Sequence, residues 1–311
     1  MWNKKGILFP SALIIFMTIS GCAEMKKPAP VMAPIGGVSG HFKVGQILDL
    51  KKGTVLSFDR LIDQISSRDL IFIGEAHDNP EHHLIQTQIL QALVDCCGPA
   101  TIAMEFFQET QQPVLDRYLQ GELDEEAFLK EIKWKDSWGF DYSFYRPLML
   151  LAKHHGYSVL AINAPQNVVK KVARHGLKSL DAEERDKLAV DIDLSNEAHR
   201  AYVRKAYERH AHGDLKEFDY FYEAQCVWED TMAENLAEYL KENGKKLIAF
   251  TGNGHIINKF GIPDRTIERI PVSMVTIMPY ALSETESIEK EMADYVWLTA
   301  DYSPRRVRIE K

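Results

Sequence analysis

The sequence predicts an α/β fold in which a mainly parallel sheet is flanked by helices, with one helical excursion. Short apolar runs alternate with stretches of helical periodicity from residue 57 onward, and polar residues directly follow several of the apolar runs. Such alternation is typical of parallel strands joined by crossover helices. No internal repeat or low-complexity segment follows the first 40 residues, so we expect residues 41–311 to form a single domain.

The first 40 residues have the pattern of an exported, lipid-anchored protein. Two lysines precede an apolar run over residues 7–19, and small residues then lead to Cys22. This pattern predicts a lipoprotein signal peptide over 1–22 with lipidation at Cys22. Residues 23–40 are rich in Pro, Gly and Ala without periodicity, which predicts a flexible tether. Ala23 is typical of lipoproteins sorted to the outer membrane, so we expect an anchor in the cell envelope there.

The elements of the first half follow from periodicity and from helix-ending residues. Residues 70–73 are an uninterrupted apolar run, which favours a strand buried on both faces. Asn79 and Pro80 then supply an N-cap and a first-turn proline, so a helix is expected over 80–95, before Gly98. The same criteria predict helices at 57–66, 111–118, 125–132 and 142–155 and a strand at 100–107.

The second half continues the alternation. A strand at 157–164 leads to Pro165, which opens a helix over 166–174. The polar region 181–212 forms the excursion, with helical periodicity at 196–210. A long helix rich in aromatic residues is expected over 215–243, and strands are expected at 246–251, 272–278 and 295–299.

Composition excludes several classes of protein. The formal net charge is −8 and no Lys/Arg-rich block occurs after the signal peptide, which argues against nucleic acid as a partner. Four cysteines are too few for a disulfide scaffold, and we expect the adjacent pair Cys96 and Cys97 to be small buried or semi-buried side chains. A nucleophile elbow, a Walker loop, an HExxH motif and a dinucleotide fingerprint are all missing from the sequence.

Polar side chains follow three of the predicted strands. Glu75 and His77 come after the first, Glu105 closes the second, and His255 follows the strand at 246–251. Because the carboxyl ends of parallel strands meet at one edge of a sheet, these four side chains are expected to converge. Two imidazoles and two carboxylates suit a divalent metal or general acid–base chemistry. The same histidines could instead hydrogen-bond across the strand ends and only stabilise the edge.

Two other groups of residues leave alternatives open. The stretch 197–212, EAHRAYVRKAYERHAH, contains two tyrosines together with imidazole and cationic side chains. Phenolate oxygen ligates ferric haem and cations suit its propionates, although a solvated amphipathic helix has the same composition. His82 and His83, in the first turn of the helix at 80–95, belong either to the strand-end site or to the surface.

Five ordered motifs within residues 57–278 resemble the ChaN family of haem-binding uptake lipoproteins. They are GEAHDNPEHH (74–83), AMEFF (103–107), INAP (162–165), FYEAQCVWEDTMAE (221–234) and TGNGHI (251–256). The resemblance implies haem handling at the bacterial surface, with two haems face to face in a homodimer. It also implies that a tyrosine of one subunit ligates iron, while a histidine and a lysine of the partner meet the propionates.

The resemblance does not identify the tyrosine by a short motif. Tyr202 is the first choice and Tyr207 the second, because both lie in the excursion between the INAP and AQ motifs. His199 and Lys205 are the candidates for the propionates. The expected function is therefore that of a lipid-anchored haem-binding protein, which serves outer-membrane or periplasmic components of haem and iron uptake.

A wider resemblance gives the alternative. ChaN-like proteins look like relatives of the Tiki metalloproteases and of erythromycin-esterase-like enzymes, which share paired GxxH motifs and an acid. GEAH (74–77), GNGH (252–255) and Glu105 match that pattern. The alternative is a metal-dependent hydrolase that uses Glu75, His77, Glu105 and His255 around a divalent metal. A binding protein is favoured over an enzyme.

Overall fold

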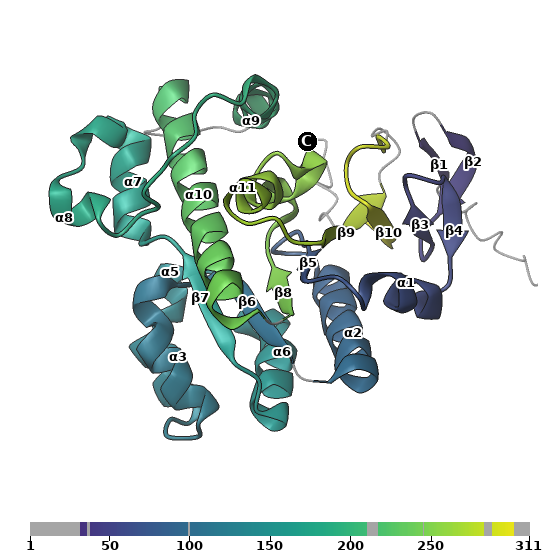
Figure 1. The fold of residues 1–311 in the computed structure, drawn as a ribbon, viewed down its shortest axis with the longest axis horizontal. Coiled ribbons are helices and arrows are strands. Elements are labelled where there is room, and N and C mark those ends of the chain that lie inside the picture. Colours follow the sequence, from purple (N-terminus) through teal and green to yellow (C-terminus); the bar gives the residue numbers. More distant parts are fainter. Residues whose placement is uncertain are drawn as a thin grey trace, which may run out of the picture. The chain divides into compact units, whose positions relative to one another are not determined.

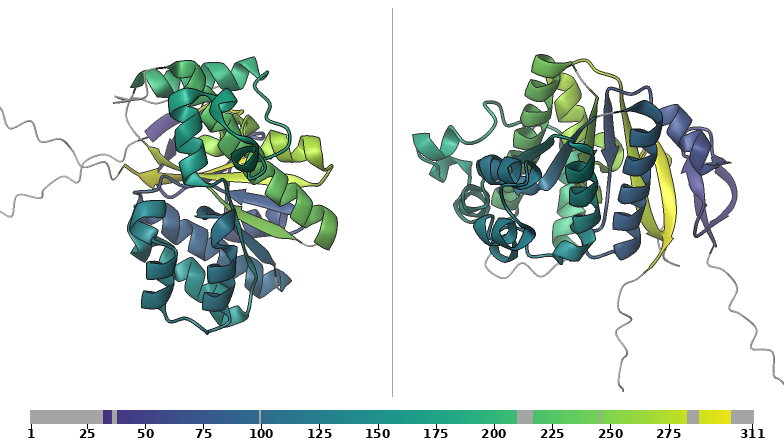
Figure 2. Two further views of the ribbon diagram at one scale, coloured as in Figure 1. Left: turned by 90° about the vertical axis from the view of Figure 1, so that its left-hand side faces the viewer. Right: turned by 90° about the horizontal axis from the view of Figure 1, so that it is seen from below.

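The computed structural model describes residues 32–35, 38–98, 100–209, 217–244, 246–282 and 288–301 of the chain. Within these residues an eight-stranded sheet carries helices on both faces, as Figures 1 and 2 show. This arrangement confirms the predicted α/β fold with a mainly parallel sheet. The predicted signal peptide, Cys22 and part of the predicted tether lie outside the described residues.

The strand order places three of the strands that lead to the predicted site next to one another. The sheet runs β4-β3-β10-β9-β5-β8-β6-β7. Neighbours from β10 to β7 are parallel, whereas β3 and β4 form an antiparallel edge. The carboxyl ends of β5, β8 and β6 therefore meet at one edge. The strands are β3 (Ile47–Asp49), β4 (Thr54–Leu56), β5 (Leu70–Ile73), β6 (Thr101–Gln108), β7 (Val159–Asn163), β8 (Leu247–Phe250), β9 (Met274–Leu282) and β10 (Tyr295–Ala300).

One face of the sheet packs on the helices from the first half of the chain. Ile71 and Ile73 of β5 share an apolar cluster with buried side chains of these helices. Full burial of each such isoleucine contributes about 1.5–3 kcal/mol. The helices are α1 (Phe58–Ile65), α2 (Pro80–Cys97), α3 (Gln112–Leu119), α4 (Glu125–Glu131), α5 (Trp134–Ser137) and α6 (Tyr142–His155).

The opposite face packs on helices from the second half, as the left view of Figure 2 shows. Leu70 and Phe72 point to this side, because successive residues of a strand face opposite ways. They pack with α10 (Phe218–Asn243) and α11 (Ile262–Arg269), and α7 (Gln166–His175) lies beside α10. Strand β5 is thus buried on both faces, as its apolar run predicts.

The predicted helical excursion lies between β7 and β8. It contains α7, the short α8 (Ala182–Arg185), α9 (Glu197–Arg209) and α10. Val203 of α9 packs with Phe218 and Tyr222 of α10 in a small separate core. This core holds the stretch with the predicted haem ligands against the main body of the domain.

Two expectations differ from the structure. Strands β1 (Met32–Ile35) and β2 (Val38–Lys43) pair antiparallel within part of the predicted tether, so backbone hydrogen bonds order residues that composition alone marks as unstructured. Cys96 and Cys97 are exposed and joined in a disulfide, rather than buried. They lie beyond Val94, the last buried residue of α2, where the helix no longer faces the core.

The sequence analysis also missed two short edge strands and one amphipathic helix. Strands β3 and β4 have only three residues each, whereas α11 carries a start signal, the proline that follows Ile262 in its first turn. Among the described residues, no helix has the length and apolar character needed to cross a lipid bilayer.

Candidate functional site

The carboxyl ends of β5 and β8 meet closely because of a glycine. Gly74 follows β5, and a Cβ atom at this position would collide with the side chain of Asn253. The backbone of Asn253 in turn donates to the carbonyl of Glu75 at 2.7 Å. The turn after β5 therefore packs against the turn after β8, which brings Glu75 and His77 next to His255.

Glu75 is a buried carboxylate surrounded by ring groups. Its Oε1 lies 2.6 Å from His77 Nδ1 and accepts a hydrogen bond from the Tyr145 hydroxyl at 3.2 Å. Its Oε2 lies 2.9 Å from His83 Nδ1. Burial would raise the pKa of Glu75, but the contacts with His77 and His83 outweigh burial and hold that pKa below its usual value. Glu75 therefore orients both imidazoles as an anion.

The two helix-start histidines are both buried and have different roles. Asn79 caps α2 by accepting from the backbone N–H groups of Glu81 and His82. His82 Nδ1 accepts from the backbone of Ala76 at 2.8 Å, and burial lowers the pKa of His82 to about 4. His83 is only 2 % exposed and contacts Glu75. The surface alternative is therefore wrong for both residues, and His83 joins the strand-end site.

Glu105 is the second buried acid, and a second glycine connects it to His77. Glu105 Oε2 accepts from the Gly252 backbone N–H at 2.6 Å, and Oε1 lies 3.4 Å from His255 Nε2. A Cβ atom at Gly252 would lie 2.9 Å from His77 Cε1, so only glycine leaves room for that ring. Burial opposes ionisation, but the charges of His255 and His77 keep the pKa of Glu105 below its usual value. The predicted convergence of the four side chains therefore exists.

The predicted strand at 100–107 is confirmed as β6, but Glu105 lies inside the strand and does not close it. The strand extends to Gln108, and its register with β7 shifts between Met104 and Gln108. Such an irregularity re-aims a side chain within a strand. This shift explains how Glu105 reaches the carboxyl edge from inside β6.

A third buried carboxylate, Glu229 of α10, completes the cluster and was not predicted. Its Oε1 lies 3.1 Å from His255 Nδ1 and accepts from Gln225 Nε2 at 2.7 Å, while its Oε2 lies 3.1 Å from His199 Nε2. Burial disfavours the charge, but the contacts with His199 and His255 hold the pKa of Glu229 far below its usual value. Burial would lower the pKa of His255, yet Glu105 and Glu229 raise it to about 10.

The expected divalent metal does not fit this cluster. Among the described residues, no group of three or more His, Cys, Asp or Glu side chains is arranged to hold a metal ion. The physical reason is that the carboxylates already face imidazole nitrogens or backbone N–H groups, as at Glu75 and Glu105. The side chains neutralise one another instead of pointing at one common centre.

Two cavities share the wall formed by His77 and His255. The first, here called the Tyr202 cavity, has a volume of about 360 Å³ and is also lined by Tyr202, Val203 and Phe221. The second, here called the Trp228 cavity, has a volume of about 230 Å³ and is also lined by Glu105, Trp138, Phe140, Asn163 and Trp228. The imidazoles therefore face two separate spaces.

The structure separates the four predicted haem residues. Tyr202 lines the Tyr202 cavity, next to the strand-end histidines. Tyr207 packs against the rings of Phe218 and Phe221, with ring centroids 5.5 and 5.1 Å away. Lys205 is exposed on α9.

His199 is placed otherwise than expected. It is 1 % exposed and lies between Glu229 and the ring of Tyr222. Because the buried Glu229 already occupies its Nε2 side, this placement argues against contact with a propionate. His199 instead anchors α9, the helix that carries Tyr202, to α10.

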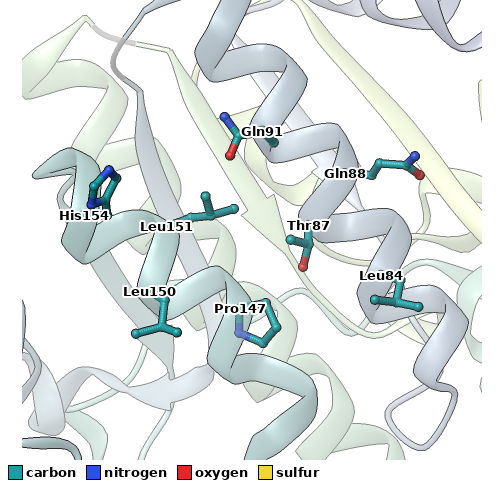
Figure 3. A pocket seen from close by; sticks show the side chains of 8 residues that line it. All are labelled: Leu84, Thr87, Gln88, Gln91, Pro147, Leu150, Leu151 and His154. Carbon is teal, nitrogen blue, oxygen red and sulfur yellow. The ribbon is translucent and has the colours of Figure 1, made fainter.

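A larger groove elsewhere on the protein is lined by none of these acids and imidazoles. An apolar groove of about 900 Å³ lies between α2 and α6, and Figure 3 shows its lining side chains. Leu84 and Leu150 are exposed there, and no residue of the buried acid–imidazole cluster lines the groove. Cavity size therefore does not identify the site, whereas the converging titratable groups do.

Comparison with known proteins agrees with the fold. Residues 61–266 match the family model described as haem-binding uptake, Tiki superfamily, ChaN. The chain is similar to the solved structure of cofacial haem binding to ChaN of Campylobacter jejuni, with a TM-score of 0.63, 20 % identity, and coverage of 81 % of this chain and 95 % of that chain.

Two further structures are more distant. A mutant of the erythromycin esterase EreC in its open conformation has a TM-score of 0.45 and 13 % identity over 75 % of this chain and 76 % of that chain. The type III effector HopBA1 has a TM-score of 0.45 and 14 % identity over 88 % of this chain and 99 % of that chain. No curated protein sequence matches the chain. The match over residues 61–266 shows that the chain belongs to the ChaN family of haem-binding uptake proteins, within the Tiki superfamily.

Proposed function

We propose that this protein binds haem in the Tyr202 cavity, with the phenolate oxygen of Tyr202 as the ligand of the ferric iron. The observation that carries this proposal is the position of Tyr202, which lines a cavity together with the apolar side chains of Val203 and Phe221. Apolar walls suit the faces of a porphyrin, and a tyrosine oxygen is an established axial ligand of ferric haem. The ChaN structure of Campylobacter jejuni binds haem cofacially, which supports haem as the ligand.

The donor set around the cavity fits an iron porphyrin better than a bare metal ion. The cavity volume of about 360 Å³ is smaller than a whole haem, so a haem bound there would extend out of the cavity. His77 and His255 both line it, and their nearest acids are the buried Glu75 and Glu229. Tyr202 contributes a phenol to the lining of this cavity, and we assign that oxygen to the ferric iron.

We also propose a homodimer, on the basis of the exposed Lys205 on the helix that carries Tyr202. Lys205 follows Tyr202 by three positions on α9, so the two side chains lie on neighbouring parts of the helix surface. Lys205 is exposed and available to a second copy of the chain. We assign it to the propionates of the haem bound by the partner, with the two haems face to face.

The cellular role is proposed from the sequence signals. Cys22 after an apolar segment supports a lipid anchor, and Ala23 supports the outer membrane as its location. The protein would accept or hold haem there and transfer it to components of haem and iron uptake. A tyrosine-ligated ferric haem favours carriage over electron transfer.

Tyrosine substitutions test the ligand. Haemin is titrated into the purified full-length protein and the absorbance spectrum is recorded. Tyr202→Phe keeps the ring and removes the oxygen, so we expect loss of the high-spin, tyrosine-ligated spectrum. Tyr207→Phe is the matched control on the same helix and should keep that spectrum. The opposite pattern would move the ligand to Tyr207, and two unchanged spectra would refute tyrosine ligation.

A second candidate function is hydrolysis by the strand-end cluster. The supporting observation is that Glu75 orients His77 at 2.6 Å while His77, Glu105 and His255 line the Trp228 cavity. An imidazole held by a carboxylate is the arrangement used in general acid–base catalysis. Hydrolysis of simple esters, lost in His77→Ala and kept in Tyr202→Phe, would support this function. Equal background rates in all three proteins would exclude it for those substrates.

A further inference from the structure

The disulfide between Cys96 and Cys97 is not a structural cross-link. A disulfide stabilises a fold mainly by restricting the loop that it closes in the unfolded chain, and the effect grows with the length of that loop. These two cysteines are adjacent in the sequence, so the bond encloses no residue between them. Both also lie beyond Val94, the last buried residue of α2. The bond therefore neither joins distant parts of the chain nor supports the core.

The bond is accessible to a thiol from outside the protein. Both cysteines are exposed at the end of α2, and Gly98 follows them as the C-cap. Exposed disulfides exchange readily, whereas structural disulfides resist reduction. Cys226, by contrast, is 0 % exposed, and burial raises the pKa of its thiol to about 12. Among the cysteines that the structure describes, only the adjacent pair is therefore open to thiol chemistry.

The surroundings of the pair favour thiols over thiolates after reduction. The C-terminal end of a helix carries partial negative charge, which disfavours a thiolate. Asp95 is exposed directly before the pair and adds a negative charge. Cys96 Sγ lies 3.5 Å from the carbonyl oxygen of Leu93, which can accept the S–H of a reduced Cys96. The reduced pair is therefore expected to be a neutral dithiol.

We propose that the Cys96–Cys97 disulfide is an exchange site for a protein that carries a dithiol. One thiolate of the partner attacks Cys96 or Cys97, so a mixed disulfide forms, the Cys96–Cys97 bond breaks, and the released sulfur takes up a proton. The second thiol of the partner then attacks the mixed disulfide, which closes the partner's own disulfide and releases the other cysteine, again protonated. In total, two electrons and two protons pass from the partner to the pair.

The adjacency of the two cysteines selects a dithiol over a monothiol. After attack by a monothiol, the freed cysteine lies next to the mixed disulfide and expels the monothiol by the reverse reaction. Its effective concentration for this return is on the order of millimolar or more. A dithiol completes the reduction, because its own second thiol is equally close to the mixed disulfide.

The pair lies far from the proposed haem site. Helix α2 has 18 residues, so its two ends are about 25 Å apart. His83, in the first turn, contacts Glu75 of the strand-end cluster at 2.9 Å, whereas Cys96 and Cys97 end the helix. The inference therefore does not depend on haem binding, and failure of either proposal leaves the other unaffected.

The test is reduction of the purified full-length protein without denaturant, followed by alkylation with iodoacetamide and peptide mass spectrometry. Cleavage after Lys and Arg places Cys22, the Cys96–Cys97 pair and Cys226 on different peptides. We expect no alkylation of the pair before reduction and alkylation of both its cysteines after treatment with dithiothreitol. Glutathione at equal thiol concentration should give about tenfold less alkylated pair. Cys226 is the internal control and should stay unmodified, because it is buried.

Cys97→Ser tests the role of adjacency. The variant and the unsubstituted protein are incubated in the same mixture of reduced and oxidised glutathione. Without its neighbour, Cys96 should keep the glutathione adduct, whereas the unsubstituted protein should accumulate about tenfold less of it. The substitution is at an exposed position, so we expect the fold to be kept. The comparison of dithiothreitol with glutathione needs no substitution and remains decisive if the variant fails to fold.

Each of the following results would overturn the inference. Alkylation of Cys96 and Cys97 before any reductant is added would show that they are not joined. Reduction of the pair only in denaturant, or alkylation of Cys226 to the same extent, would show that exposure does not distinguish the pair. Equal reduction by glutathione and by dithiothreitol would remove the preference for a dithiol. Equal glutathione adducts in Cys97→Ser and in the unsubstituted protein would show that adjacency has no effect.

Discussion

Removal of the Glu229 carboxylate is expected to destabilise the fold strongly. Glu229 is 0 % exposed and faces His199, His255 and Gln225 at 2.7–3.1 Å, with Arg265 Nε at 3.6 Å. Breaking a buried ion pair by removing one partner costs about 3–5 kcal/mol, because the remaining charges stay buried. We therefore expect Glu229→Ala to lose about that much free energy of unfolding.

Equilibrium unfolding in urea, followed by far-UV circular dichroism, measures this loss. With an m-value of about 3 kcal/mol per molar urea, Glu229→Ala should lower the unfolding midpoint by about 1–1.7 M. Glu229→Gln keeps the shape and some hydrogen bonds, so its midpoint should lie between those of Glu229→Ala and the unsubstituted protein. Glu238→Ala, at an exposed position of the same helix, should change the free energy by less than about 0.5 kcal/mol. Equal midpoints for Glu229→Ala and Glu238→Ala would refute the reasoning.

Three further predictions concern the same cluster. The pKa of Glu229 is lowered from 4.5, so the stabilisation by this carboxylate should be lost as pH falls below 4.5. The pKa of His255 is raised from 6.5 to about 10, so the stabilisation by this imidazolium should be lost as pH rises from 6.5 towards 10. A pH series of unfolding midpoints checks both limits, and a midpoint that stays flat to pH 10 would contradict the second. Gly252→Ala places a Cβ 2.9 Å from His77 Cε1, so the His77 ring resonances in an NMR spectrum should shift more than in Gly254→Ala, where the space is open. Reduction of the exposed Cys96–Cys97 disulfide should change the free energy of unfolding, measured in urea, by less than about 0.5 kcal/mol. A larger change would show that the pair supports the core.

Much of the fold could be predicted because the strands are buried on both faces. Continuous apolar runs such as Leu70–Ile73 are readily recognised, and glycines or prolines mark the neighbouring helix ends. The edge strands β3 and β4 could not be predicted in this way, since three residues do not establish a period. The pairing of β1 with β2 depends on a partner strand and leaves no clear local signal.

The strand-end part of the site could also be predicted, because topology alone brings Glu75, His77, Glu105 and His255 to one edge. The role of Glu229 could not, since an acid in a long helix normally faces solvent, and here contacts with α9, α11 and the turn after β8 surround it. His199 shows the same limit. Its position among the cationic residues of α9 suggested contact with the haem propionates, whereas the helix turns it inward to Glu229.

The Trp228 cavity was hidden for a different reason. Its lining comes from β6, β7, α5, α7, α10 and the turns after β5 and β8, so no contiguous motif describes it.

The central claim is that the Tyr202 cavity binds haem between two copies of the chain. The most direct measurement is a haemin titration of the unsubstituted protein, followed by absorbance and by mass in solution. We expect saturation at one haem per chain, a high-spin spectrum typical of tyrosine ligation, and a shift from monomer to dimer as haem is added. Binding that fails to saturate, or a saturated spectrum without any oxygen ligand, would contradict it.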